Sequence, residues 1–224
     1  MKGTAGCGLK KEFADGFKGL VFDVDGVIFD SRASNIEYYN LIRQAVQLPP
    51  ISTEDEDFCH AASVGEALER IIPPERRELA FRACRQINYT ERILPLLSLE
   101  PGLLETLHWL RQRNVRLAVF TNRSNSIEAL LRHFCLESFF APVMTAATGA
   151  PKPCPDGLLS IIEEWRVAPG QIAFLGDSRV DEQAAKSAGV PFWAFRNQAL
   201  DARVHVPDFF KMIAWMTPLV EGRQ

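Results

Sequence analysis

The chain has 224 residues, of which 47% are hydrophobic and 24% are charged, and its formal net charge is -3 at pH 7. This length can bury one core with a modest insertion, and the small negative charge gives no reason to expect nucleic acid or an anionic membrane as a partner. An anionic ligand must then be bound by local features. No run approaches the ~18 apolar residues of a membrane span, and the N-terminus lacks the apolar run of a signal peptide, so we expect a cytoplasmic protein.

The first predicted strand is followed by a long helical region. After a polar N-terminal segment, the run GLVFDV at 19–24 predicts a buried strand. Between residues 33 and 97, apolar residues recur at three- and four-residue spacing, which is typical of amphipathic helices. The clearest of these segments are 34–48, 64–72 and 73–94. We find no convincing strand here, so the sequence predicts a helical insertion directly after the first strand.

From residue 101 onward, predicted helices and strands alternate. Helical patterns cover 101–114, 124–134, 155–167 and 180–189. Apolar β-rich runs cover 115–121, 141–146, 171–178 and 191–195. Strands separated by helices favour βαβ units and a parallel sheet, which is an α/β fold. Residues 206–220 fit either a terminal helix or a strand with a helical turn, and their aromatic residues Phe209, Phe210 and Trp215 are expected in the core.

Polar residues gather where the predicted strands end, which is where open parallel sheets bind ligands. They are Asp23 and Asp25 after the first strand, Thr121 and Asn122 after the strand at 115–121, Lys152 in the loop GAPKPCPD, and Asp177, Ser178 and Asp181 after the run IAFLG. Each of them alone is typical of a helix cap or a turn. Their occurrence together, at four separate strand or loop ends, indicates a functional site.

Four short segments resemble the motifs of the haloacid dehalogenase-like hydrolases. DVDGV resembles the family's Asp-x-Asp-x-(Thr/Val) motif, VFTN its strand ending in Thr or Ser, KPCPD its lysine motif, and GDSRVD its Gly-Asp-x-x-x-Asp motif. The motifs stand in the family's order. The resemblance implies a Rossmann-like three-layer core with a parallel sheet, formed by residues 1–31 and 98–224. The helices of residues 32–97 are then expected to form an all-α cap domain of the C1 type.

The resemblance also implies a phosphatase, a hydrolase of phosphate monoesters, that works through an aspartyl-phosphate. Asp23 would be the nucleophile. Asp25 points to the same side of an extended chain and would act as general acid and then as general base. Gly26 suits a tight turn where backbone amides approach a phosphate. The residues expected to bind the phosphoryl group are Gly26, Thr121, Asn122 and Lys152, of which Thr121 and Lys152 are also expected to be catalytic.

A magnesium ion is the expected cofactor, because carboxylates and carbonyls are the hard oxygen ligands that Mg²⁺ prefers. Its expected ligands are Asp23, Asp25 through its backbone carbonyl, Asp177 and Asp181. A small phosphorylated metabolite, such as phosphoglycolate or a sugar phosphate, is the expected substrate, and a monomer or small homo-oligomer the expected assembly. Arg32 and Arg123 are better substrate-ligand candidates than the cap arginines, which fit solvated helix faces. These cap arginines are Arg43, Arg70, Arg76, Arg77, Arg82, Arg85 and Arg92.

Single residues argue for or against the other reactions that this family catalyses. Dehalogenases lack the second aspartate of the first motif, so Asp25 argues against them. Phosphonate hydrolases need a cap lysine, and there is no lysine between Lys18 and Lys152. A phosphosugar mutase shares all four motifs and stays open. A binding module without catalysis is disfavoured, because it would not need Asp25, and unoccupied carboxylates would repel one another.

Overall fold

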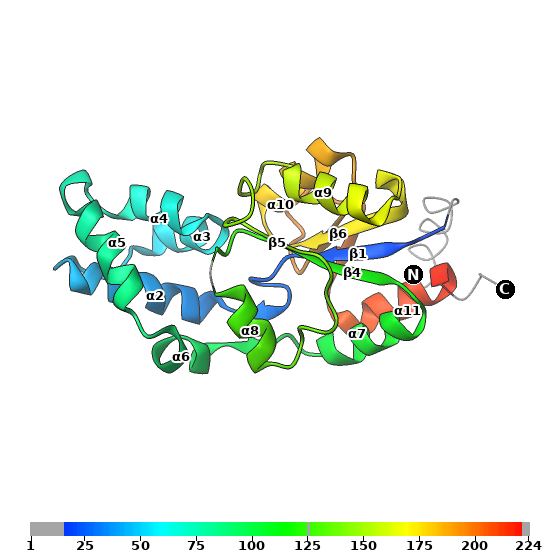
Figure 1. The fold of residues 1–224 in the computed structure, drawn as a ribbon, viewed down its shortest axis with the longest axis horizontal. Coiled ribbons are helices and arrows are strands. Elements are labelled where there is room, and N and C mark those ends of the chain that lie inside the picture. Colours follow the sequence, from blue (N-terminus) through cyan, green and yellow to red (C-terminus); the bar gives the residue numbers. More distant parts are fainter. Residues whose placement is uncertain (1–15, 125, 221–224) are drawn as a thin grey trace.

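The computed structural model describes residues 16–124 and 126–220. Predictions that involve residues 1–15, including the start of the predicted core, lie outside these residues. A six-stranded sheet with the order β5-β4-β1-β6-β7-β8 forms the centre of the molecule (Figure 1). Its strands are β1 (Gly19–Phe22), β4 (Arg116–Thr121), β5 (Val143–Thr145), β6 (Ile172–Gly176), β7 (Phe192–Phe195) and β8 (Val204–Val206). All neighbouring pairs are parallel, which confirms the α/β prediction.

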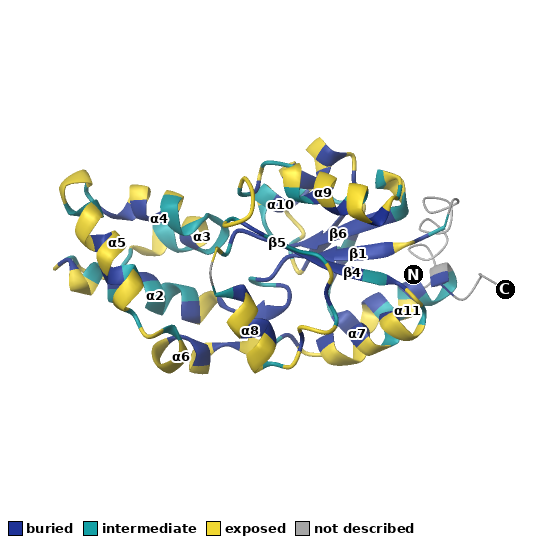
Figure 2. Cartoon of the chain, viewed as in Figure 1, coloured by how far each residue is buried: buried dark blue, intermediate teal, exposed yellow. Residues whose placement is uncertain are grey.

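Helices cover both faces of this sheet, because successive strand residues point to opposite sides. Leu20 and Phe22 of β1 pack into one core with α7 (Leu103–Gln112), α8 (Ile127–His133) and α11 (Phe209–Val220). Val21 packs into the other core with α9 (Asp156–Trp165) and α10 (Arg179–Ala188). The short helix η3 (Pro169–Gln171) lies between α9 and β6. The three-layer arrangement is visible in Figure 2, where the strands are buried and the outer helix faces exposed.

The helical insertion lies beyond one end of the sheet. It contains α2 (Arg32–Ala45), α3 (Thr53–Ala61), α4 (Val64–Ile71), η1 (Pro74–Arg76), α5 (Arg77–Gln86), α6 (Tyr89–Arg92) and η2 (Leu94–Leu96). These helices bury a core of their own, which includes Tyr39, Ile42 and Leu68. Two chain segments join the insertion to the sheet and pair as β2 (Phe29–Asp30) and β3 (Ser98–Leu99). The division at residues 31 and 98 stays a prediction.

Two elements differ from the sequence-based prediction. Helix α3 was not anticipated, because its sequence TEDEDFCHA is acidic and has little apolar periodicity. At the C-terminus, a strand comes before the helix: β8 closes the sheet edge and α11 follows it, with Phe209 buried and Phe210 56% exposed. The expectation that Phe210 belongs to the core is therefore wrong. Within the described residues, none of the helices combines the length and the apolar character that a bilayer crossing demands.

The adjacent residues Phe209 and Phe210 provide a test of this packing. Phe209 contacts the rings of Phe22 and Phe195, so we expect Phe209→Ala to lower the free energy of unfolding by ~3–5 kcal/mol. Phe210→Ala should lower it by about 1 kcal/mol or less, because this ring is mostly exposed. Urea unfolding of the two variants measures both values. Equal losses would contradict the assignment of the buried face of α11.

Candidate active site

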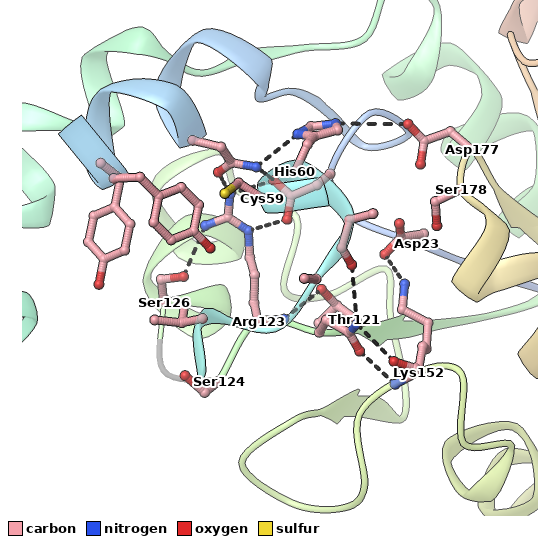
Figure 3. A pocket seen from close by; sticks show the side chains of 18 residues that line it. Asp23, Cys59, His60, Thr121, Arg123, Ser124, Ser126, Lys152, Asp177 and Ser178 are labelled. Carbon is pink, nitrogen blue, oxygen red and sulfur yellow. Dashed lines mark hydrogen bonds and ion pairs between the residues drawn. The ribbon is translucent and has the colours of Figure 1, made fainter. Parts of the chain in front are cut away.

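A cavity of about 70 Å³ lies between the carboxyl ends of the strands and the helical insertion (Figure 3). Its walls include seven residues that the sequence singled out: Asp23, Asp25, Thr121, Asn122, Lys152, Asp177 and Ser178. They converge because β1 is flanked by β4 and β6, so the loops after these three strands meet at one edge of the sheet. The other two predicted residues are placed differently: Asp181 is fully buried behind the cavity wall, and Gly26 is not part of that wall.

The amine of Lys152 joins two of the acids. Lys152 Nζ donates to Oδ1 of Asp23 and to Oδ1 of Asp181, both at 2.6 Å. Burial alone would lower the pKa of Lys152, but the charges of Asp181 and Asp23 raise it, so the amine is a cation. The second oxygen of Asp181 accepts hydrogen bonds from the backbone N–H and the hydroxyl of Ser178. Ser178 is thus both a residue of the cavity wall and the N-cap of α10.

Three carboxylates are close enough to share one cation. Asp23, Asp177 and Asp181 each offer an oxygen, and these oxygens lie within 4.8 Å of one another. Burial, together with the charge of Asp181, raises the pKa of Asp23 to about 7 despite the opposing effect of Lys152. Burial and the charges of Asp181 and Asp23 also raise the pKa of Asp177. Three hard oxygen donors whose mutual repulsion is only partly balanced fit a divalent cation such as Mg²⁺.

Gly26 leaves the space that the carboxylate of Asp177 occupies. Gly26 has φ +76°, and a Cβ at this position would lie 2.1 Å from Oδ2 of Asp177. Its backbone N–H donates to the carbonyl of Phe29, so in this conformation that amide is used inside the turn. The structure therefore gives Gly26 a steric role beside Asp177, and direct phosphate binding by this residue stays a prediction.

Asp25 is bound to Arg123, one of the two arginines that the sequence favoured as substrate ligands. Arg123 donates from Nε to Oδ2 of Asp25 at 2.7 Å and from Nη2 to Oδ1 at 2.6 Å. Burial by itself would raise the pKa of Asp25, but the charge and hydrogen bonds of Arg123 outweigh it and lower the pKa to about 2. Asp25 is therefore an ionised carboxylate here. Its side chain is not part of the three-carboxylate group, and a metal contact through its backbone carbonyl stays a prediction.

The two polar residues after β4 hold their neighbours in place. Asn122 accepts a hydrogen bond from the N–H of Lys152 at 2.7 Å, and its amide group donates to the carbonyls of Lys152 and Ala61. Both amide hydrogens are used in this way, so Asn122 fixes the lysine loop against β4. Thr121 Oγ1 accepts from the N–H of Arg123 at 3.1 Å, which leaves its hydroxyl hydrogen free to be donated into the cavity.

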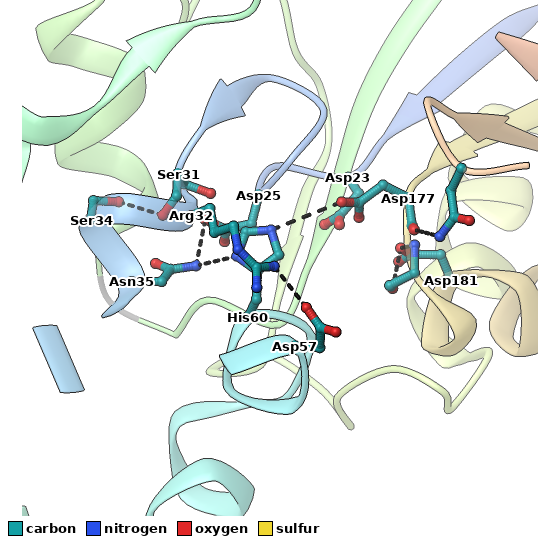
Figure 4. Close-up of polar contacts among 12 residues, drawn as sticks. Asp23, Asp25, Ser31, Arg32, Ser34, Asn35, Asp57, His60, Asp177 and Asp181 are labelled. Carbon is teal, nitrogen blue, oxygen red and sulfur yellow. Dashed lines mark hydrogen bonds and ion pairs between the residues drawn. The ribbon is translucent and has the colours of Figure 1, made fainter. Parts of the chain in front are cut away.

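The helical insertion contributes side chains that the sequence analysis did not find. Asn35 of α2 donates to Asp25 at 3.3 Å and lies 3.0 Å from Nδ1 of His60 (Figure 4). His60 of α3 places Nε2 3.9 Å from the carboxylate of Asp177, and burial lowers its pKa. Tyr89 of α6 accepts from Arg123. These residues follow no strand, so no strand-end pattern marks them in the sequence.

The other candidate arginines are used elsewhere. Arg32 forms ion pairs with Glu56 and Asp57. Arg43, Arg76 and Arg77 donate to backbone carbonyls within the insertion, so they are part of its framework and not of a solvated face. Arg70, Arg82 and Arg92 pair with acids of the insertion. None of these arginines belongs to the cavity wall.

Comparison with known proteins agrees with this geometry. The family model of the haloacid dehalogenase-like hydrolases matches residues 20–195. The chain belongs to this family. The match contains all four motifs, and it confirms the family resemblance that the motifs indicated.

Individual members of the haloacid dehalogenase-like family are also similar to this chain. The phosphoglycolate phosphatase of Escherichia coli is 28% identical over 199 residues, which cover 78% of this chain and 79% of that enzyme. The phosphoglycolate phosphatase of Pseudomonas putida is 40% identical over 92 residues, but the match spans only 34% of that enzyme. A crystal structure of a haloacid dehalogenase-superfamily hydrolase from Geobacter sulfurreducens is 35% identical, with a TM-score of 0.72 over 88% of this chain and 95% of that chain.

The contact between Gly26 and Asp177 yields a prediction about stability. We expect Gly26→Ala to lower the free energy of unfolding by at least ~1–2 kcal/mol, because its φ is left-handed and the added methyl group displaces the Asp177 carboxylate. Gly65→Ala is the matched control: there, a Cβ meets only the hydroxyl of Ser63 at 4.0 Å, and we expect a gain of about 0.5 kcal/mol. Urea unfolding measures both, and an unchanged stability of Gly26→Ala would contradict the steric role.

Proposed function

We propose that the protein is a Mg²⁺-dependent phosphatase that hydrolyses a small phosphorylated metabolite through an aspartyl-phosphate. The observation that supports this most is the convergence of Asp23, Lys152 and the acid pair Asp177 and Asp181 in one buried cluster beside a small cavity. Phosphoryl transfer requires positioning and neutralisation of charge, and this cluster provides fixed groups for both. The phosphatase names of the relatives fit the same reaction.

In the first step, an oxygen of Asp23 attacks phosphorus while the bond from phosphorus to the ester oxygen breaks. Lys152 holds the carboxylate of Asp23 in position at 2.6 Å, and with Thr121 it would bind phosphoryl oxygens. The leaving alkoxide needs a proton, which Asp25 would supply. Because Asp25 is ionised in the free protein, its carboxylate must first take up a proton from solvent. Both oxygens of Asp25 now accept from Arg123, so one of these hydrogen bonds must be exchanged for one to the ester oxygen.

In the second step, water attacks the aspartyl-phosphate. Asp25 as an ionised carboxylate takes a proton from this water, the bond between phosphorus and Asp23 breaks, and phosphate leaves. Asp23, Asp177 and Asp181, with the backbone carbonyl of Asp25, would hold the magnesium ion. When bound, Mg²⁺ neutralises the repulsion between the carboxylate of Asp23 and the phosphate.

The helical insertion would act as the cap of this site. Its residues Asn35 and His60 already line the cavity, so water can be excluded only while the insertion stays against the strand ends. Phosphoglycolate or a sugar phosphate are the proposed substrates. We also propose that the enzyme works in the cytoplasm as a monomer or small homo-oligomer.

Hydrolysis assays test the proposed chemistry. We expect wild-type protein with Mg²⁺ to hydrolyse p-nitrophenyl phosphate, acetyl phosphate or a member of a phosphometabolite panel, and EDTA to abolish this activity. Asp23→Asn should lower kcat/KM by roughly 10³-fold or more, because an amide cannot attack phosphorus. Asp30→Asn is the matched control, since Asp30 lies in the same stretch but is exposed, and it should keep the wild-type activity. Activity that survives in Asp23→Asn contradicts the nucleophile assignment, and an inert wild type favours a binder or a strict mutase.

The pKa of Asp23 makes magnesium binding depend on pH. This pKa, about 7, lies above the ordinary value of 3.8, so ionisation of Asp23 lowers the stability of the metal-free protein as pH rises between these values. At about pH 6 the carboxyl group holds a proton that Mg²⁺ must displace, and at about pH 8 it does not. We therefore expect Mg²⁺ to raise the Tm more at the higher pH, measured by calorimetry. Asp23→Asn should lose most of this difference, and an equal rise at both pH values in the wild type would contradict the prediction.

A further inference from the structure

Arg123 and Lys152 are the two cations among the described residues that line the cavity, apart from His60, whose pKa is lowered by burial. The amine of Lys152 is bound to Asp23 and Asp181, on the side of the nucleophile. None of the arginines of the insertion belongs to the cavity wall. A substrate that carries a second anionic group beside its phosphate can therefore find a cationic partner at one position, the guanidinium of Arg123.

One edge of this guanidinium is held by neutral oxygens, which an anionic ligand can displace. Asp25 accepts from Nε and from one hydrogen of Nη2. The remaining hydrogens go to neutral oxygens: Nη1 donates to Ser126 Oγ at 3.1 Å and to the Tyr89 hydroxyl, and Nη2 donates to Asn35 Oδ1 at 3.3 Å. A carboxylate is a stronger acceptor than any of these three, and it matches the two-pronged edge of a guanidinium.

We infer that Arg123 is the specificity-determining residue of this site, and that it binds the carboxylate of a phosphorylated small hydroxy acid through Nη1 and Nη2. This inference rests on the proposed phosphatase function. Arg123 then stands between two carboxylates, that of Asp25 on one edge and that of the substrate on the other. It brings the carboxylate of the substrate close to Asp25, the proposed proton donor to the leaving oxygen.

The spacing limits the substrate to a short molecule. Asp25 and Asp23 are two residues apart, on either side of a bend at Val24, so their Cα atoms lie at most about 7 Å apart. The phosphoryl group at Asp23 and a carboxylate at Arg123 must span a comparable distance, and the cavity has a volume of only about 70 Å³. An ester with one or two carbons between its ester oxygen and its carboxylate meets both conditions. A large sugar phosphate does not fit the cavity with the insertion in this position.

Two esters of nearly the same shape, one with a carboxylate and one with a neutral amide, test how much the negative charge contributes to recognition. The first is 2-phosphoglycolate, and the second is carbamoylmethyl phosphate, in which a neutral amide replaces the carboxylate. We expect wild-type kcat/KM to be about 100-fold higher for 2-phosphoglycolate, the effect of a hydrogen bond between charged groups. Arg123→Met should bring the two values to within a few-fold of each other, and Arg123→Lys should restore part of the preference. Arg32→Met is the matched control and should keep the wild-type ratio, because Arg32 pairs with Glu56 and Asp57.

The outcomes distinguish this inference from the proposed function. If the wild type hydrolyses both esters with similar kcat/KM, the phosphatase assignment holds and the role of Arg123 is wrong. If Arg123→Met loses activity on both esters by the same factor, Arg123 is a structural residue and the inference is also wrong. If the wild type hydrolyses neither ester nor any other phosphate ester, the proposed phosphatase function and the role of Arg123 are both wrong. Should Arg123→Met fail to fold, inhibition of the wild-type enzyme decides: glycolate should inhibit p-nitrophenyl phosphate hydrolysis at about 100-fold lower concentration than glycolamide.

Discussion

The site depends on one buried ammonium group. Lys152 is only 2% exposed and lies between Asp23 and Asp181, two carboxylates that would otherwise repel each other in a poorly solvated space. Without this cation, burial of both acids would cost several kcal/mol for each unpaired charge. The rest of the cluster follows from it: Asp181 is fixed at the start of α10 by Ser178, and the lysine loop is fixed to β4 by Asn122. The sheet positions the carboxylates of Asp23 and Asp181, and the ammonium group of Lys152 reduces the repulsion between them.

Lys152 does not balance all of the negative charge. Its single charge faces three carboxylates whose oxygens lie within 4.8 Å of one another, and the pKa values of Asp23 and Asp177 stay raised. Such an excess of acid costs stability in the free protein and is compensated when a cation binds. The second ion pair, Asp25 with Arg123, has the opposite character, since each partner carries one charge and the pKa of Asp25 is lowered. The two neighbouring aspartates of the first motif thus have different electrostatic surroundings, as two different chemical roles require.

The strand-end residues could be predicted from the sequence, because parallel strands carry their loops to one common edge. Asp23, Thr121 and Asp177 each stand at the end of an apolar run, and this pattern was sufficient to predict that they lie close together. The roles of Asn122 and Gly26 could not be predicted, since they depend on hydrogen bonds and on space between loops that are distant in sequence. Asn35 and His60 were missed for a different reason: helices carry side chains in every direction, and no spacing rule says which of them faces the cavity. Helix α3 itself was missed, because its acidic sequence lacks apolar periodicity.

The paired segments β2 and β3 are the two points where the chain passes between the sheet and the insertion, and they are hydrogen-bonded to each other. The Lys152 side chain donates to Asp23 and Asp181, on the sheet side, whereas Arg123 donates also to Asn35 and Tyr89 of the insertion. Separation of the insertion from the strand ends would remove these two contacts of Arg123, together with those of His60 to Asp177 and of Asn122 to Ala61, and would keep the ion pairs of Lys152. The ion pairs of Lys152 are thus built from the sheet side alone, whereas the surroundings of Arg123 are shared between the sheet and the insertion.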